Sequence, residues 1–429
     1  MTLQVLAEGF SSAGVPVFAA DIKGDLSGIA AVGEPKDFIV KRNEQIGLGS
    51  DWHAHAFPTI LWDVFGKEGH PIRTTVLDMG PLLLSRMLEL NEVQEGVLNI
   101  AFRVAADEQI PILDLKDLRA IIANVAERSK ELVQKYGNVA TTSVGAIQRR
   151  LLVLEEQGAE LFFGEPSLDI RDFMRVAPDG RGVVSLLAAD KLMEKPRLYT
   201  TFLLWMLTKL WQTLPEAGDL PKPKLVFFFD EAHLLFNEAP KALLERIEQI
   251  ARLIRSKGVG VYFITQNPMD VPNSVSAQLG NRVQHALRAF TPQEQRAVRA
   301  AAETFRKNPD LDTERVILEL KVGEALVSTL ENKGEPSMVQ RTLIRPPEGR
   351  IGPISEDERL SIVEYSPVYG KYEEAVDRES AHEILTKRAN KAAEEANSGS
   401  GGGWGDIIFG GGGGGGTPGR GEPQGGSGP

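Results

Sequence analysis

The sequence predicts an α/β fold with a largely parallel sheet, followed by a glycine-rich tail that stays disordered. Short apolar runs alternate with helical patterns over residues 1–370, which is typical of strands buried between helices. Several runs end directly in charged or amide side chains, as strands do at the edge of an open sheet. The expected strands cover residues 15–20, 74–77, 182–187, 225–229, 259–265, 283–289 and 324–329.

The elements between and after these strands also follow from pattern. Residues 80–160 place apolar side chains such as Leu84, Met87 and Leu88 at helical spacing, which predicts a helical insertion. Residues 371–396 are rich in Glu, Lys, Arg and Ala, as in a charged surface helix. The tail carries the glycine run 410–416, and such a chain loses too much entropy on folding to become ordered.

The expected domain organisation therefore has five parts. An α/β core begins over residues 1–79, is interrupted by the insertion at 80–160 and continues over 161–350. A charged helical connector at 351–396 and the tail at 397–429 complete the chain. One apolar island in the tail, Trp404 with residues 407–409, is either a short docking segment for a protein partner or without a role.

Composition excludes several classes of protein. The chain has 429 residues, 42% of them hydrophobic and 25% charged, which fits a soluble globular protein and excludes collagen and bulk disorder. Its net charge of −11 does not favour binding to nucleic acid or anionic membranes, so any contact with DNA needs a local basic patch. It has no cysteine, which excludes disulfides and thiolate chemistry. Because no signal peptide or membrane-spanning stretch is recognisable, we expect a cytoplasmic protein.

The strongest chemical signal is a pair of acids, Asp230 and Glu231, that directly follows the apolar run 225–229. Ligands of open α/β sheets bind where parallel strands end. Adjacent acids at that place suit a division of labour in which Asp230 holds Mg²⁺ through water and Glu231 polarises an attacking water. This is the Walker B pattern of P-loop ATPases. A buried strand that ends in two solvated acids is the alternative interpretation.

Two further strand ends support the first interpretation. The run 259–265 leads into Gln266, an amide placed to sense a γ-phosphate or its water. The run 15–20 leads into Asp21 and Lys23, which could reach a bound nucleotide or simply mark the passage from strand to loop. The order of these elements predicts a nucleotide site at the sheet edge. A strand leads into the acids, and a helix and a second strand then lead to Gln266.

With these residues in view, the chain resembles the HerA-like P-loop ATPases of the HerA/FtsK superfamily, in particular a poorly characterised bacterial subgroup. The resemblance implies a RecA-like core, ATP and Mg²⁺ as ligands, a homo-oligomeric and commonly hexameric ring, and ATP-driven helicase or translocase action on DNA. The residues that carry it lie at 2–10, 21–28, 69–73, 80–84, 229–233 and 265–268.

One departure from the family limits these implications. Family members carry a glycine-rich phosphate loop ending in Gly-Lys-Thr before the helix that begins here at Thr2, but no Gly-x-x-x-x-Gly-Lys-[Ser/Thr] occurs in the 429 residues. That loop supplies the backbone cradle and the lysine that hold the phosphates. We therefore expect a chain shortened at its N-terminus, through a wrongly assigned start or a natural loss, that binds ATP poorly.

Ring ATPases often complete a site with an arginine from the neighbouring subunit. Arg255 and Arg282 are the candidates for such a role. The alternative to an ATP hydrolase is a non-catalytic or degenerate subunit that serves as a binding or scaffold module, so the sequence leaves enzymatic activity open.

Overall fold

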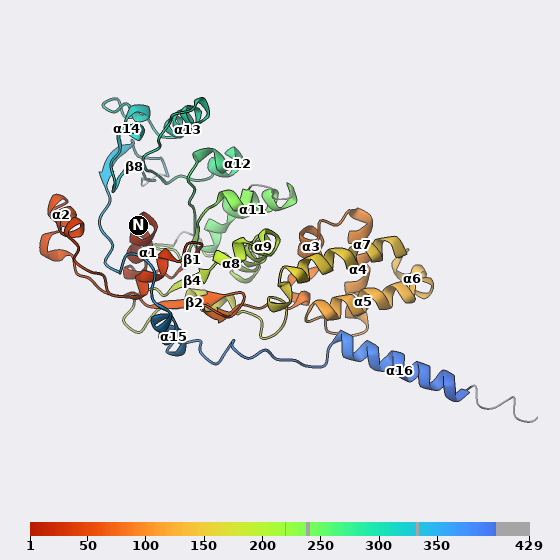
Figure 1. Ribbon diagram of the computed structural model, residues 1–429. Helices are drawn as coiled ribbons and strands as arrows, with labels where there is room; N and C mark the ends of the chain where they lie inside the picture. The colour runs from red at the N-terminus through yellow and green to blue at the C-terminus, as the bar shows by residue number, and fades with distance from the viewer. Residues whose placement is uncertain (219, 237–240, 332–333, 400–429) are drawn as a thin grey trace, which may run out of the picture. The chain divides into compact units, whose positions relative to one another are not determined.

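The computed structural model describes residues 1–218, 220–236, 241–331 and 334–399. The chain divides into two compact units, residues 1–382 and the residues from 383 onward (Figure 1). Of the expected tail, residues 397–399 form the end of helix α16 (Ala381–Gly399), whereas residues 400–429, with the apolar island, lie outside the described part. No helix among the described residues has both the length and the apolarity needed to cross a membrane.

A parallel six-stranded sheet forms the centre of the first unit, which confirms the predicted fold class. The strand order is β3-β2-β4-β1-β5-β6, and every neighbouring pair is parallel. Predicted runs at 15–20, 182–187, 225–229 and 259–265 correspond to four of these strands. The six strands are β1 (Val17–Asp21), β2 (Thr59–Asp63), β3 (His70–Pro71), β4 (Val184–Ala188), β5 (Leu225–Phe229) and β6 (Val259–Phe263).

Helices cover both faces of this sheet because its central strands are apolar on both sides. On one face, helix α1 (Thr2–Ser12) inserts Phe10 against Phe228 of β5 and Tyr262 of β6, with ring centroids 6.3 and 5.8 Å apart. On the other face, Phe18 of β1 stacks on Phe227 of β5 and touches Phe173. Aromatic pairs at such separations add to the hydrophobic burial that holds layers together.

Further α-helices and 3₁₀ helices of the first unit lie between or after these strands in the sequence. They are η1 (Asp25–Ala30), α2 (Asp37–Gln45), η2 (Gly49–Asp51), η4 (Ile170–Met174), α8 (Asp190–Met193), α9 (Pro196–Thr213), α10 (His233–Phe236), α11 (Lys241–Leu253), η5 (Ile254–Lys257) and α15 (Glu356–Glu364).

The region predicted as a helical insertion is helical. Its helices contact one another and lie side by side (Figure 1, orange to yellow). A capping box at Asn91, in which Gln94 returns the hydrogen bond, starts one of them. The boundaries 80 and 160 stay a prediction. The elements are α3 (Val76–Met87), α4 (Glu92–Asp107), α5 (Leu115–Glu127), α6 (Ser129–Tyr136), α7 (Thr141–Glu156) and η3 (Ala159–Leu161).

The strand predicted at 74–77 is wrong, because these residues start α3. The Thr75 side chain accepts a hydrogen bond from the Asp78 backbone N–H at 3.0 Å and so caps the helix. Only Thr74 keeps strand character, in an isolated parallel bridge to Phe163. A β-branched run favours a strand, but here the cap decides the local structure.

Strand β2 was not predicted, although it lies within the sheet. Its apolar run is short and follows Pro58, which weakens the strand signal. Its end is fixed by Asp63, whose buried carboxylate accepts hydrogen bonds from the backbone N–H groups of Phe65, Lys67 and Glu68. Pairing with β4, which is buried, outweighs the weak local pattern.

A second, three-stranded antiparallel sheet follows. It has the order β7-β8-β9 and packs with its helices around a small apolar cluster. The predicted strand 283–289 is shorter than expected, and the last strand was not predicted. Within the described residues, β6 pairs only with β5 and β7 only with β8, so each is the last strand of its sheet. The elements are η6 (Pro268–Asp270), α12 (Asn273–Ser276), β7 (Arg282–Gln284), α13 (Pro292–Glu303), α14 (Thr313–Glu319), β8 (Glu324–Ser328) and β9 (Gln340–Leu343).

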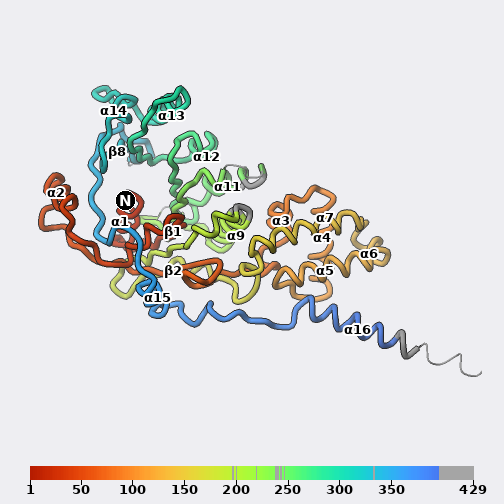
Figure 2. Tube along the Cα trace, viewed as in Figure 1, coloured from red at the N-terminus to blue at the C-terminus, as the bar shows by residue number. Residues whose placement is uncertain are grey.

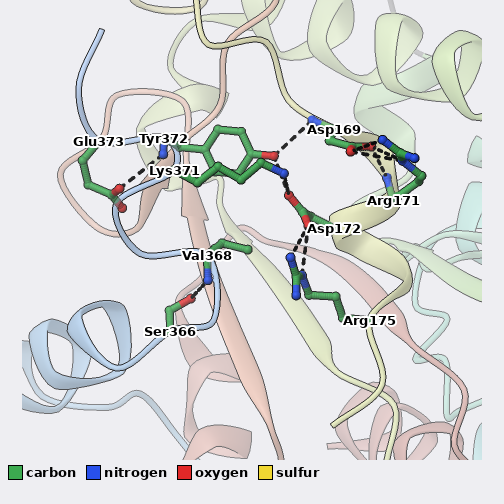
Figure 3. A network of polar contacts seen from close by, with 9 residues as sticks. All are labelled: Asp169, Arg171, Asp172, Arg175, Ser366, Val368, Lys371, Tyr372 and Glu373. Carbon is green, nitrogen blue, oxygen red and sulfur yellow. Dashed lines mark hydrogen bonds and ion pairs between the residues drawn. The ribbon is translucent and has the colours of Figure 1, made fainter.

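A segment after α15, residues 366–380, contains no helix and no multi-residue strand (Figure 2). Its side chains fasten it to the core. Tyr372 is fully buried, and its hydroxyl donates to the Asp172 carboxylate at 2.5 Å. The same carboxylate accepts from Lys371 at 2.7 Å and from Arg175 at 2.7 and 2.9 Å (Figure 3). Glu373 contacts buried His70 of β3. Asp172 is therefore the main polar anchor of this segment.

Candidate functional site

The carboxyl ends of three neighbouring strands bring the predicted residues together. Glu231 follows β5, Lys23 follows β1 and Gln266 follows β6, and β5 pairs with both of the other strands. Gln266 Nε2 donates to Glu231 Oε1 at 2.7 Å, and Lys23 Nζ lies 2.9 Å from the same oxygen. The parallel arrangement of the strands thus converts residues far apart in sequence into one polar cluster.

The backbone at Glu231 is in the left-handed region, with φ of 46°. A residue with a Cβ adopts this conformation at a cost of about 1–2 kcal/mol, and such positions cluster at functional sites. The turn is supported by a hydrogen bond from the Glu231 N–H to Asp230 Oδ1 at 3.0 Å. It places the Glu231 side chain, which is 7% exposed, against Gln266.

The two acids differ in their electrostatics. Burial raises the pKa of Asp230, and the charge of Glu231 raises it further, while Lys23 and the Met1 amino group act in the opposite direction. Burial would also raise the pKa of Glu231, but hydrogen bonds from Lys23 and Gln266 outweigh it and lower that pKa. Glu231 is therefore ionised at neutral pH.

Asp21, at the end of β1, carries the largest carboxyl shift of the site. Burial raises its pKa from 3.8 to about 6, and the charge of Asp230 contributes to the rise, although the Leu26 N–H donates to Asp21 Oδ2 at 3.0 Å. The carboxylates of Asp21 and Asp230 therefore repel each other electrostatically across the strand ends.

The raised pKa predicts that Asp21→Asn stabilises the protein at neutral pH. Between about pH 4 and 6 the folded state binds a proton that the unfolded state lacks, so stability falls as pH rises through this window. At about 1.4 kcal/mol per pKa unit the cost above pH 6 approaches 3 kcal/mol, of which we expect Asn to recover about 1–2 kcal/mol. Urea unfolding at pH 7.5 and pH 4 measures this gain. An equal gain at both pH values would contradict the assignment to Asp21 ionisation.

The amino end of helix α1 lies at the same rim. The charge of the Met1 amino group lowers the pKa of Asp230, and no side chain caps the helix. The Thr2 hydroxyl lies 2.8 Å from His285 Nε2, and His285 Nδ1 lies 2.8 Å from the Glu324 carbonyl oxygen. Since a carbonyl only accepts, Nδ1 carries the proton and Thr2 donates to Nε2. Because the charge of the Met1 amino group acts on Asp230, the positive end of the α1 dipole lies on the side of the acids.

The donor set fits a hydrated Mg²⁺ but only part of a nucleotide site. Carboxylates are the ligands that Mg²⁺ prefers, and Glu231 Oε2 is buried without a hydrogen bond in the described part of the chain. Thr265 is already engaged, because its hydroxyl donates to Asp270 at 2.5 Å. No group of three or more possible metal-ligating side chains occurs among the described residues. The printed sequence contains no phosphate-binding loop.

The two predicted arginines do not join the cluster within this chain. Arg282 donates to the Ser276 carbonyl at 3.0 Å and to the Ser276 hydroxyl at 3.3 Å, and burial lowers its pKa. Arg255 lies in η5, before β6 begins, and therefore at the opposite edge of the sheet from Gln266. A role of either residue in a neighbouring subunit stays a prediction.

Two residues of the site had no role assigned from the sequence. His233 Nδ1 lies 3.4 Å from Glu231 Oε2, and its position two residues after Glu231 is the signal that could have found it. Tyr199 of α9 is buried, its hydroxyl has no hydrogen bond among the described residues, and the charges of Asp230 and Glu231 reach it. No local pattern connects α9 with β5, so Tyr199 could only be found in the structure.

Comparison with known proteins places the fold. The model of a family described as "Helicase HerA-like C-terminal" matches residues 1–402, whereas no curated protein matches the sequence. The plasmid coupling protein TrwB in complex with ADP and Mg²⁺ is 12% identical, with a TM-score of 0.50 and coverage of 82% of this chain and 85% of that chain. TrwB with the non-hydrolysable ATP analogue ADPNP is 14% identical, with a TM-score of 0.50 and coverage of 81% and 84%.

A further solved structure is VirB4 of Thermoanaerobacter pseudethanolicus. It is 13% identical to this chain with a TM-score of 0.48, and the match covers 83% of this chain and 87% of the VirB4 chain. At such low identities the TrwB likeness concerns the fold, which is an α/β fold of the RecA-like type.

Proposed function

The chain belongs to the helicase HerA-like C-terminal family, and on this premise we propose that its strand-end cluster is the catalytic half of an ATPase site. The observation that carries the proposal is the meeting of Glu231, Gln266 and Lys23 within 2.9 Å at the ends of three parallel strands, with Asp230 beside them. The solved structures of TrwB, which has this fold, hold ADP with Mg²⁺ and an ATP analogue.

Each residue has a role in this proposal. Asp230 holds Mg²⁺ through water, and the ion would polarise the phosphate oxygens when bound. Glu231 orients the attacking water and accepts its proton, since it is ionised at neutral pH. Gln266 orients Glu231 through its hydrogen bond and would contact the γ-phosphate with its amide. Asp21 and Lys23 border the nucleotide at the end of β1.

The 429 residues position the two acids of the site, but they supply few groups that could bind the phosphates of a nucleotide. The sequence contains no Gly-x-x-x-x-Gly-Lys-[Ser/Thr], so the backbone N–H cradle and phosphate lysine are missing from it. In the described part of the chain, β6, the strand before Gln266, pairs only with β5, and Val259 is the one residue of β6 that is buried. Both observations support weak nucleotide binding.

A nucleotide titration tests this proposal. Because its sequence contains no phosphate loop, we expect the 429-residue protein to bind Mg·ATP with a Kd above about 1 mM. This Kd corresponds to a binding free energy weaker than about 4 kcal/mol. A version extended before Thr2 by a strand and a Gly-x-x-x-x-Gly-Lys-Thr loop should bind at least about tenfold more tightly. Isothermal calorimetry on both proteins measures the difference. Tight Mg·ATP binding by the unextended protein would contradict the expectation.

The competing function is a non-catalytic subunit or scaffold. It is favoured by the same missing loop, since a subunit without phosphate contacts can still assemble with others. The extended version discriminates between the two functions, because a scaffold would remain without hydrolysis after the loop is added. An ATPase would gain hydrolysis.

Family membership supports four further parts of the proposal. They are translocation on DNA, a hexameric ring, a trans-acting arginine and a cytoplasmic location. A translocase should hydrolyse ATP faster in the presence of DNA, and this stimulation should fall steeply with salt. Hydrolysis by the extended version with and without duplex DNA at two salt concentrations measures this. A protein partner for the tail is a separate proposal.

A further inference from the structure

Lys23 and Gln266 both approach one oxygen of Glu231. Lys23 Nζ lies 2.9 Å from Oε1, and Gln266 Nε2 donates to Oε1 at 2.7 Å. The lone pairs of this oxygen are directed at two donors, one of them charged, and charge-assisted hydrogen bonds are the strong ones. Oε1 is therefore unavailable to take a proton from a water molecule.

The other oxygen of Glu231 is also poorly placed as a base. Oε2 is buried and accepts no hydrogen bond among the described residues, and His233 Nδ1 lies 3.4 Å from it. The side chain of Glu231 is 7% exposed, so a solvent molecule has little access to it. The carboxylate is thus closed in by its partners.

Lys23 is the exposed member of this group. Its side chain is 59% exposed, and the next residue, Gly24, has a φ of 73° that permits a tight turn. Lys23 also lines a cavity of about 70 Å³ at the ends of β1, β2 and β4, together with Asp190 and Arg359. The side chain therefore has room to move away from Glu231 and a second carboxylate to move toward.

We propose that Lys23 masks Glu231, so that in the nucleotide-free protein the Lys23 amine, and not water or an added nucleophile, contacts the Glu231 carboxyl until Lys23 leaves it. The consequence for catalysis rests on the proposed function, whereas the mask itself is a property of the protein without nucleotide.

Zero-length crosslinking of the full chain without nucleotide tests the mask. A water-soluble carbodiimide converts the Glu231 carboxyl into an O-acylurea, which the Lys23 amine attacks to form an amide, while the carboxyl oxygen leaves on the urea and the amine loses a proton to water. Close contact favours this reaction over attack by solvent. Mass spectrometry of the digested protein should therefore find the Lys23–Glu231 amide.

A matched pair of variants completes the test. In Lys23→Met, added glycine ethyl ester should label Glu231 at least about threefold more than in the unmodified protein, because the charged partner is gone. Lys191 Nζ lies 3.1 Å from Glu68 Oε1, so this pair should crosslink in the same sample, and Lys191→Met should not change Glu231 labelling.

Two results would overturn the proposal: no Lys23–Glu231 amide in a sample where Lys191–Glu68 forms, or equal Glu231 labelling with and without Lys23. Neither readout involves ATP. A protein that shows the mask but never hydrolyses ATP would refute the proposed function alone, and an ATPase with an open Glu231 would refute the mask alone.

Discussion

Glu231→Gln is expected to slow ATP hydrolysis by about 10²–10⁴-fold in the version of the protein extended by a phosphate loop, because this is the usual contribution of a positioned general base. Gln keeps the shape of the side chain and can still accept hydrogen bonds from Lys23 and Gln266, so the site should stay assembled. It cannot take a proton from water. Single-turnover hydrolysis measures the loss, and calorimetry should show nearly unchanged affinity for Mg·ATP.

The matched control is Glu319→Gln, which removes the same charge from an exposed ion pair with Arg315 on α14. Exposed pairs of this kind contribute about 0–1 kcal/mol, and this one is remote from the strand ends, so hydrolysis should not change. Normal hydrolysis in Glu231→Gln would contradict the assignment of the base. Loss of Mg·ATP binding in the same variant would instead show that Glu231 holds the ligand.

The strand ends of the site could be predicted because parallel strands have a strong local signal. Residues 225–229 are five consecutive apolar residues, and the polar residues that follow can only lie at the edge of the sheet. That Asp230, Glu231 and Gln266 lie together follows from the fact that neighbouring parallel strands end on the same side. The breadth of the family resemblance also rested on such local motifs, and the family model confirms it.

What the sequence did not predict depends on contacts between distant residues. The ion pair of Lys23 with Glu231 joins the ends of β1 and β5, which are neighbours in the sheet but far apart in the sequence. No spacing rule connects these two residues. Likewise, no spacing rule shows that the Arg282 guanidinium donates to Ser276, and the role of Arg282 in a neighbouring subunit stays a prediction. At 74–77 a helix cap competes with β-branched propensity, and the sequence alone does not show that the cap prevails.

Asp172→Ala is expected to destabilise the protein by about 2–3 kcal/mol, since it removes the acceptor of three side chains at once. The Asp172 side chain is 6% exposed and extends from η4 to Lys371 and Tyr372 of the segment 366–380 (Figure 3). Its loss leaves the buried Tyr372 hydroxyl without a carboxylate partner and Lys371 without its counter-ion. Urea unfolding followed by circular dichroism measures the change.

The pH dependence of the same anchor has a definite sign. Burial would raise the pKa of Asp172, but hydrogen bonds from Lys371, Tyr372 and Arg175 outweigh burial and hold it below its usual 3.8. The stabilisation is therefore complete above about pH 4 and is lost as pH falls through the lower pKa of the folded state. The difference between the unmodified protein and Asp172→Ala should shrink in acid.

Asp169→Ala is the control for Asp172→Ala, because Asp169 pairs at 2.7 Å with Arg171, whose side chain is 75% exposed. Screening by solvent limits such a pair to about 0–1 kcal/mol, and the same side chain also caps η4 by accepting from the Arg171 N–H, so we expect a loss of about 1 kcal/mol, below that of Asp172→Ala. Equal destabilisation by the two substitutions would mean that the segment 366–380 is held by its apolar contacts, with the Tyr372 ring against Trp62, rather than by the Asp172 carboxylate. A large effect of Asp172→Ala alone would identify the buried carboxylate as the group that fastens this segment to the sheet.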